Sequence, residues 1–152
     1  MSSAGRSVDR VLDRLGLLLL ALAVLFQAVY CLPEIALASV SVHDGTLHHA
    51  LALRVLDAAR TGENPIDPWV SFSSLGSPVW RSYQPLVHWV MAGAIALGAP
   101  VASSGAVVGG LTWLALVLHP VAFFAAARGL GVSRFVAGVA ASICLAPVAV
   151  GN

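Results

Sequence analysis

The sequence contains no lysine, only two cysteines and few charged residues of either sign. Charged residues make up 10% of the chain, whereas soluble domains carry about 25%. All of the fixed positive charge therefore lies on arginine, and a net charge of +1 is too small to attract a polyanion. These deficits exclude a disordered chain, a nucleic-acid-binding arm and an ordinary cytosolic enzyme.

The two cysteines, Cys31 and Cys144, lie in two different apolar segments. Two distant cysteines form neither a disulfide framework nor a recognisable metal motif. We therefore expect both thiols to pack as small hydrophobic side chains.

Apolar residues are abundant: 59% of the chain is hydrophobic, and the mean hydropathy is +0.89. No charged residue occurs in 15–33, 82–127 or 135–152. A helix that crosses a bilayer needs about 20 such residues. We predict an all-α, polytopic protein that forms a single membrane domain over residues 1–152. Its crossings are expected at about 12–32, 84–101, 106–127 and 134–150.

Three arginines, Arg6, Arg10 and Arg14, precede the first apolar run. The positive-inside rule then predicts a cytoplasmic N-terminus and an extracytoplasmic loop over 33–83, as in a multi-pass protein of the bacterial plasma membrane. Ala36-Leu37-Ala38 also resembles a signal-peptide cleavage site, so removal of residues 1–38 stays an alternative. The loop lies outside the cytoplasm on either interpretation.

Two rules disagree about the side of the membrane on which the last turn, residues 128–134, lies. Strict alternation of four crossings puts Arg128 and Arg134 outside, whereas the positive-inside rule favours the cytoplasm for them. Two arginines are a small bias, and alternation is the expectation. Because the chain stops as its last apolar run ends, we also expect it to be the N-terminal fragment of a longer protein.

The loop over 33–83 carries most of the ionisable groups. From about residue 46 to 60, apolar residues such as Leu47, Leu51 and Val55 recur every four positions, which predicts an amphipathic helix lying along the membrane interface. Asp57 and Arg60 are spaced to form an ion pair on another face of this helix. Gly62 is the expected residue at its end.

A polar cluster begins this loop with His43, Asp44, His48 and His49. Asp44 could act chemically or could only cap the helix. Asp44 and His48, four residues apart, could also share a divalent metal ion, although the spacing matches no established zinc motif. Further along, His88 lies one turn after Gln84, close to the loop, in an otherwise apolar run, where an ionisable group is a functional candidate.

Several short motifs follow one another in a recognisable order. They are His43-Asp44 with His48, then the segment from Gly62 to Trp69, then Gly76-Ser77-Pro78, then the segment from Tyr83 to Trp89. Over residues 12–135 this order resembles the N-terminal module of GT-C-type membrane glycosyltransferases. The most similar group is a set of bacterial membrane proteins labelled as related to pyruvoyl-tetrahydropterin synthase, a label that implies no pterin chemistry.

The resemblance implies transfer of a sugar from a polyprenyl-phosphate donor on the extracytoplasmic face. Asp44 matches the carboxylate that serves as general base or as a metal-linked group, so a divalent metal is the one cofactor implied. Arg81 is placed to hold the donor phosphate. Further substrate contacts would come from Tyr83, His43, His48 and His88. The partners implied are the lipid bilayer and the lipid-linked sugar donor.

Two rival interpretations stay open. The chain could be a non-catalytic polytopic membrane protein, such as a transporter segment or a scaffold. Transporters place ionisable groups near the middle of the bilayer, whereas the polar cluster here lies in an outer loop, which favours an enzyme. A sensor of metal or pH built on the histidines is the third hypothesis.

Overall fold

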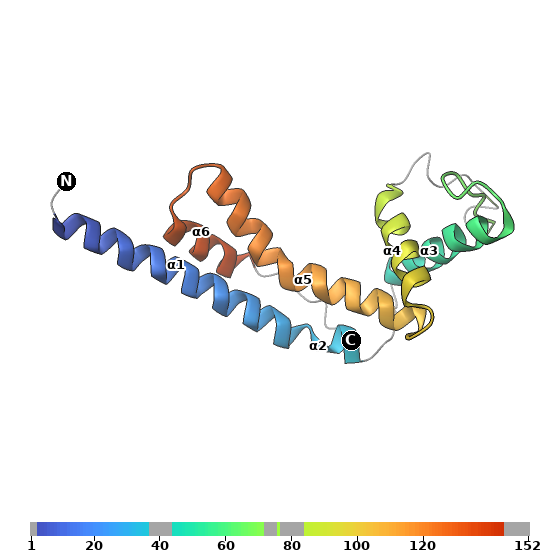
Figure 1. The fold of residues 1–152 in the computed structure, drawn as a ribbon, viewed down its shortest axis with the longest axis horizontal. Helices are drawn as coiled ribbons and strands as arrows, with labels where there is room; N and C mark the ends of the chain where they lie inside the picture. Colours follow the sequence, from blue (N-terminus) through green and yellow to red (C-terminus); the bar gives the residue numbers. More distant parts are fainter. Residues whose placement is uncertain (1–2, 37–43, 72–75, 77–83, 145–152) are drawn as a thin grey trace. The chain divides into compact units, whose positions relative to one another are not determined.

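A computed structural model describes residues 3–36, 44–71, 76 and 84–144 (Figure 1). Every regular element in these residues is a helix, which confirms the all-α prediction for them. The helices are α1 (Ser3–Tyr30), α2 (Leu32–Ala36), α3 (Asp44–Thr61), α4 (Leu86–Gly98), α5 (Ser104–Gly129) and α6 (Arg134–Ile143).

Helix α4 is shorter than the crossing expected at 84–101. It has 13 residues, which at 1.5 Å per residue span about 20 Å. The hydrocarbon core of a bilayer is about 30 Å thick. The other expected helices agree with the structure to within a few residues, except that α1 begins at Ser3 and that residues 145–150 lie outside the described residues.

Two helical segments among the described residues are long and apolar enough to cross a membrane. They are Ser7–Ala36 and Ser104–Gly129, and 22% of the most apolar window of each is buried. A signal sequence or the core helix of a soluble protein can meet the same criteria of length and composition. The core helix of a soluble protein, however, is mostly buried, and these two segments are mostly exposed.

The chain divides into two compact units. The first contains residues 1–36 and 112–150, and the second is built mainly from residues 37–111. Helix α5 contributes to both, since the division falls after Leu111. Each unit has a different kind of interior.

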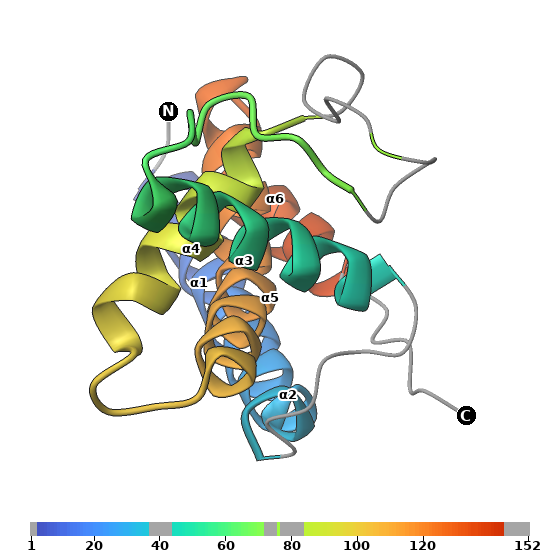
Figure 2. The same cartoon turned by 90° about the vertical axis from the view of Figure 1, so that its right-hand side faces the viewer.

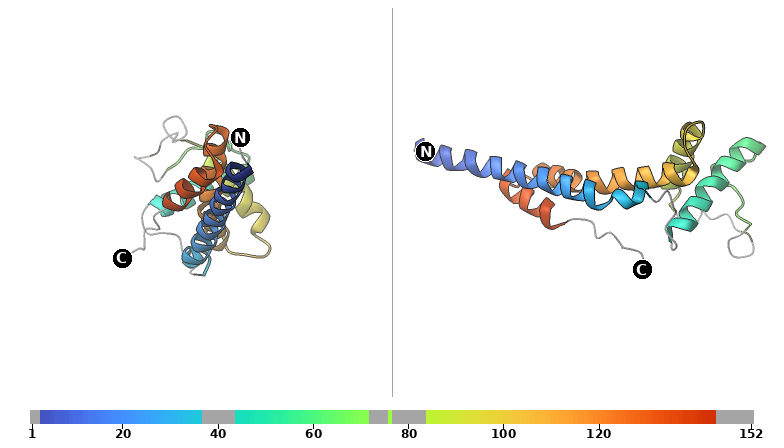
Figure 3. Two further views of the ribbon diagram at one scale, coloured as in Figure 1. Left: turned by 90° about the vertical axis from the view of Figure 1, so that its left-hand side faces the viewer. Right: turned by 90° about the horizontal axis from the view of Figure 1, so that it is seen from below.

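In the first unit, α6 packs against α1 (Figure 3). Two glycines form the contact. A Cβ atom placed on Gly138 would lie 2.2 Å from the carbonyl oxygen of Gly16. A Cβ atom on Gly16 would lie 2.2 Å from the carbonyl oxygen of Arg134. Only glycine permits such an approach of two backbones, and small residues at helix contacts are typical of membrane proteins.

The buried side of α1 is narrow. It consists of Gly16, Ala23 and Gln27, and Cys31 just beyond the helix continues the same stripe. The large residues of α1 point away from it, and Leu18, Leu22 and Leu25 are all more than half exposed. This arrangement, with small residues and the polar Gln27 inside and large apolar residues outside, is the reverse of a soluble helix.

In the second unit, α3 and α4 pack together, as Figure 2 shows. Leu51, Val55 and Ala58 are buried on α3, as the predicted four-residue spacing requires, whereas Leu47 is 43% exposed. The apolar core joins α3, α4 and the start of α5 and consists of Ala52, Met91, Ile95 and Val108. Gly62 has φ 78° directly after α3, which is the left-handed conformation expected of a glycine that ends a helix.

Candidate functional site: a histidine pair and an arginine-anchored loop

His48 on α3 and His88 on α4 meet in the second unit. The Nδ1 atom of His48 lies 2.9 Å from Nε2 of His88, although the two residues are 40 positions apart in the chain. The His88 side chain is 1% exposed. The structure therefore brings together two of the residues that sequence analysis singled out and buries one of them between helices.

The hydrogen bonds around His88 define its neutral tautomer. Nδ1 of His88 lies 3.1 Å from the carbonyl oxygen of Gln84, and a carbonyl can only accept, so Nδ1 carries the proton. Nε2 of neutral His88 is then an acceptor, and Nδ1–H of His48 donates to it.

The other predicted site residues are placed less completely. Asp44 is the first residue of α3 and stands one turn before His48, but its side chain is outside what the structure describes. His43, Arg81 and Tyr83 lie outside the described residues altogether. Their roles as substrate contacts therefore stay predictions from the sequence.

Within the described residues, no three His, Cys, Asp or Glu side chains come together as a set that could hold a metal ion. Nδ1 of His48 lies at a distance from Nε2 of His88 that is typical of a hydrogen bond. The metal site suggested for Asp44 and His48 stays a prediction, since the Asp44 side chain lies outside the described residues.

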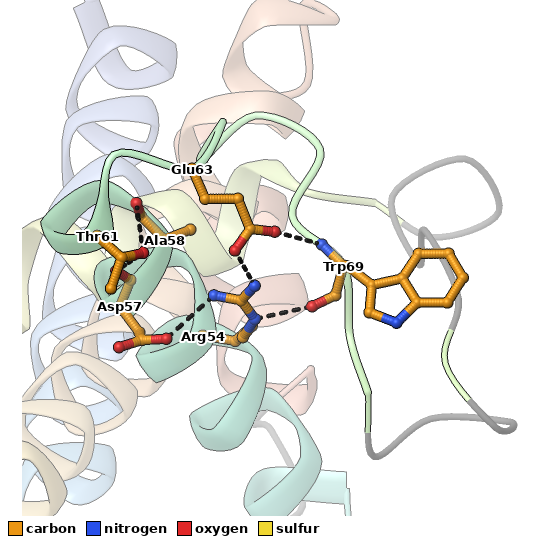
Figure 4. Close-up of polar contacts among 6 residues, drawn as sticks. All are labelled: Arg54, Asp57, Ala58, Thr61, Glu63 and Trp69. Atoms are coloured by element: carbon orange, nitrogen blue, oxygen red, sulfur yellow. Dashed lines mark hydrogen bonds and ion pairs between the residues drawn. The ribbon is translucent and has the colours of Figure 1, made fainter.

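Arg54 anchors the loop that follows α3 (Figure 4). Its Nε–H donates to the carbonyl oxygen of Trp69 at 2.8 Å, and its two terminal nitrogens contact the carboxylates of Asp57 and Glu63. Glu63 in turn accepts a hydrogen bond from the backbone N–H of Trp69 at 2.9 Å. One guanidinium group, 17% exposed, thus ties residues 63 and 69 to the helix.

This network lowers the pKa of the Glu63 carboxyl. The largest cause is the hydrogen bond from Arg54, followed by the bond from the backbone N–H of Trp69. Both stabilise the ionised carboxylate. Glu63 is therefore negatively charged throughout the neutral pH range and keeps the loop attached there.

Sequence analysis did not identify this network. Asp57 was expected to pair with Arg60, but its carboxylate lies 3.1 Å from Nη1 of Arg54, three residues in the other direction. The spacing of Arg54 and Asp57 is equally suitable on a helix. Nothing in the sequence distinguishes the two pairs, because Glu63 and the Trp69 carbonyl decide between them and lie beyond the helix.

Gly76 lies against the indole of Trp69. A Cβ atom on Gly76 would lie 2.6 Å from Nε1 of that ring, and the φ of Gly76 is +94°. Both facts require glycine here. The Gly62–Trp69 segment and the Gly76-Ser77-Pro78 segment, which were recognised separately in the sequence, are therefore in contact at these two residues.

An open apolar cleft of about 270 Å³ lies between α3, the loop and α4. Leu56, Ile66 and Trp89 are among the residues that line it, together with Gly93 of α4, which has no side chain. Trp69 and Ile66 are 54% and 64% exposed. The polar histidine pair and this apolar cleft belong to the same unit.

Comparison of the chain with protein-family models, with curated proteins and with solved structures found no match.

Proposed function

We propose that this chain is part of a polytopic membrane glycosyltransferase of the GT-C kind, which transfers a sugar from a polyprenyl-phosphate donor on the extracytoplasmic face. The proposal rests on the resemblance of the motif order. The observation that supports it best is the 2.9 Å contact between His48 and His88. This contact joins the first motif, at the start of α3, to the last one, at the start of α4.

The location in a membrane has its own support. The two long apolar segments are mostly exposed, and an exposed apolar helix is stable in lipid but not in water. The glycine contacts between α1 and α6 are of the kind that brings helices together without a hydrophobic driving force.

Each residue has a chemical task in this proposal. An acceptor hydroxyl is a poor nucleophile, and the carboxylate of Asp44 would remove its proton as the new glycosidic bond forms. Arg81 would stabilise the phosphate that leaves with the polyprenyl chain. His43, His48, Tyr83 and His88 would position the substrates. A divalent metal ion, if one is used, would need ligands in addition to Asp44 and His48.

The test is a transfer assay with the product of the complete reading frame in liposomes that contain a labelled polyprenyl-phosphate sugar. We expect Asp44→Asn to abolish transfer. Asp57→Asn is the matched control, because it makes the same change on the same helix at a side chain that is 65% exposed. A wild-type rate for Asp44→Asn would exclude the assignment of the base.

A non-catalytic scaffold is the alternative, and one observation favours it. Arg54, Asp57 and Glu63 all contribute to tying the loop to α3, which is a structural use of charge. Absence of transfer by the complete protein with several donors, together with an unchanged fold, would leave the scaffold as the better explanation.

A further inference from the structure

Helices α1 and α5 run antiparallel within the first unit, and contacts near both ends define this direction. Nε1–H of Trp113, in the first half of α5, donates to the carbonyl oxygen of Ala28 near the end of α1 at 3.0 Å. At the other end, Nη1 of Arg134 lies 3.1 Å from Oδ2 of Asp13. The turn that follows α5 is therefore level with the beginning of α1.

The glycine contact fixes the same level independently. Gly16 touches the backbone of Arg134 and of Gly138, and Gly16 lies two residues after Arg14, the last charged residue at the beginning of α1. The turn between α5 and α6 is compact: Gly131 has φ 82°, and Nη1 of Arg128 donates to the carbonyl oxygen of Val132 at 2.5 Å.

Five of the eight arginines consequently gather at one end of this unit. They are Arg6, Arg10, Arg14, Arg128 and Arg134. Considered separately, the turn between α5 and α6 carries only two arginines, which is a small bias toward the cytoplasmic side. Together the five are a strong cytoplasmic signal under the positive-inside rule.

The direction of α5 constrains the membrane topology of the segment between α1 and α5. If α1 leaves the cytoplasm and α5 returns to it, the segment between them begins and ends on the outer side. Helix α4 then cannot be a single crossing. Its length of 13 residues, about 20 Å, leads to the same conclusion from a different observation.

The surface of α4 indicates where it lies. His88, Met91 and Ile95 are buried in the second unit, whereas Leu86, Val90 and Leu97 are 66%, 55% and 84% exposed on the opposite side. Residues 86–98 contain no charge. A helix that is apolar on both sides and too short to cross has one side against its own unit and the other available to lipid.

We propose that α4 does not cross the membrane but lies in the outer leaflet, with the face formed by Leu86, Val90 and Leu97 in contact with lipid. The turn from Arg128 to Arg134 is then cytoplasmic, and residues 37–103 are all extracytoplasmic. This inference rests on the membrane location proposed above and does not depend on glycosyl transfer.

Cysteine labelling in intact cells tests this topology, because alternation predicts the opposite result at two positions. Cys31 and Cys144 are first replaced by Ala, and single cysteines are introduced as Val101→Cys and Leu130→Cys. These two side chains are 87% and 85% exposed. With a membrane-impermeant maleimide, we expect the cysteine at 101 to react in intact cells and the one at 130 to react only after permeabilisation.

Ile66→Cys is the control for the outer side, since both topologies place it there, and Val11→Cys is the control for the cytoplasmic side. Labelling at 130 but not at 101 in intact cells would overturn the inference and restore alternation. If 101 is unreactive even after permeabilisation, Ala102→Cys replaces it, and protection of that cysteine until permeabilisation would also overturn the inference. Recovery of the protein in the soluble fraction would overturn the membrane location itself, which is a separate outcome.

Discussion

The two units of this chain are stabilised in different ways, although both are rich in apolar residues. In the first, α1 and α6 touch through the backbones of Gly16 and Gly138, and the ion pair between Asp13 and Arg134 lies at one end. In the second, larger side chains form the core, and His48, His88 and Arg54 make hydrogen bonds between or beyond the helices.

Under the membrane location proposed above, this difference corresponds to two solvents. Lipid provides little hydrophobic driving force between helices, so close backbone contact replaces it. At a surface that meets water, burial of Met91 and Ile95 is favourable in itself, and charged groups such as Arg54 and Glu63 can stay partly solvated while they pair. The comparison predicts that the units respond differently to the same kind of substitution.

The largest expected effect is that of Gly138→Ala. The new methyl group would meet the carbonyl oxygen of Gly16 at 2.2 Å, and neither backbone can rotate away. We expect a loss of about 2–3 kcal/mol in the free energy of unfolding in detergent, as for other overpacked contacts. Gly110→Ala is the control, because among the described residues no atom outside the adjoining backbone of its own helix lies within 4 Å of its added Cβ. Equal stability of the two variants would contradict the proposed glycine contact.

His48→Phe should have the next largest effect, and it acts on the second unit. It keeps a ring but removes the donor to Nε2 of buried His88, which we expect to lower the free energy of unfolding by about 1–2 kcal/mol. His49→Phe is the neighbouring control, because Nε2 of His49 has no hydrogen-bond partner among the described residues. A similar loss in both variants would mean that ring packing, and not the hydrogen bond, stabilises this contact.

Acid should detach the loop from α3. The pKa of Glu63 is below its ordinary value of 4.5 because Arg54 and the Trp69 N–H bind the carboxylate. With a folded-state pKa below the unfolded one, the stabilisation is complete above about pH 4.5 and is lost as the pH falls through the folded-state pKa. Hydrogen exchange at the Trp69 amide, referred to the intrinsic rate at each pH, should therefore lose protection in this acidic range.

Arg54→Met separates this effect from general acid unfolding. Protection of the Trp69 amide should fall about tenfold already at neutral pH and should then depend little on pH between 3 and 6. Arg60→Met, at an exposed position of the same helix, should behave as wild type. An unchanged acid transition in Arg54→Met would show that another group controls the loop.

The smallest expected effect is that of Asp13→Asn. The pair with Arg134 joins side chains that are 41% and 50% exposed, and such pairs contribute at most about 1 kcal/mol. The loss of unfolding free energy should therefore be far smaller than that caused by Gly138→Ala, although Asp13 lies only three residues before Gly16, the contact partner of Gly138. A larger loss at Asp13 than at Gly138 would reverse the view that backbone contact dominates the first unit.

Much of the fold could be predicted because helix formation depends on local patterns. The four-residue recurrence from Leu51 to Val55 predicted α3, and the left-handed Gly62 ended it where expected. Helix α4 was predicted too long, since the apolar run continues through Ala99 and Pro100 although the helix stops at Gly98. Hydropathy indicates where the chain is apolar but not where a helix ends.

The candidate site was predicted in part. His48 and His88 were each selected for a local reason, one as a member of the polar cluster and the other as an ionisable group in an apolar run. That they bind each other was not predictable, because 40 residues separate them. The role of Arg54 in holding the loop was missed for the same reason, since its partners, the Glu63 carboxylate and the Trp69 carbonyl, lie beyond the helix.

The sequence alone determined the helical class, the apolar segments and the end of α3, because hydrophobic spacing, charge and glycine act within a few residues of one another. The tertiary structure alone decided which helices meet: Gly16 against Gly138, Trp113 against Ala28, and His48 against His88. These pairings depend on distances between segments far apart in the chain, and periodicity within a segment carries no record of them.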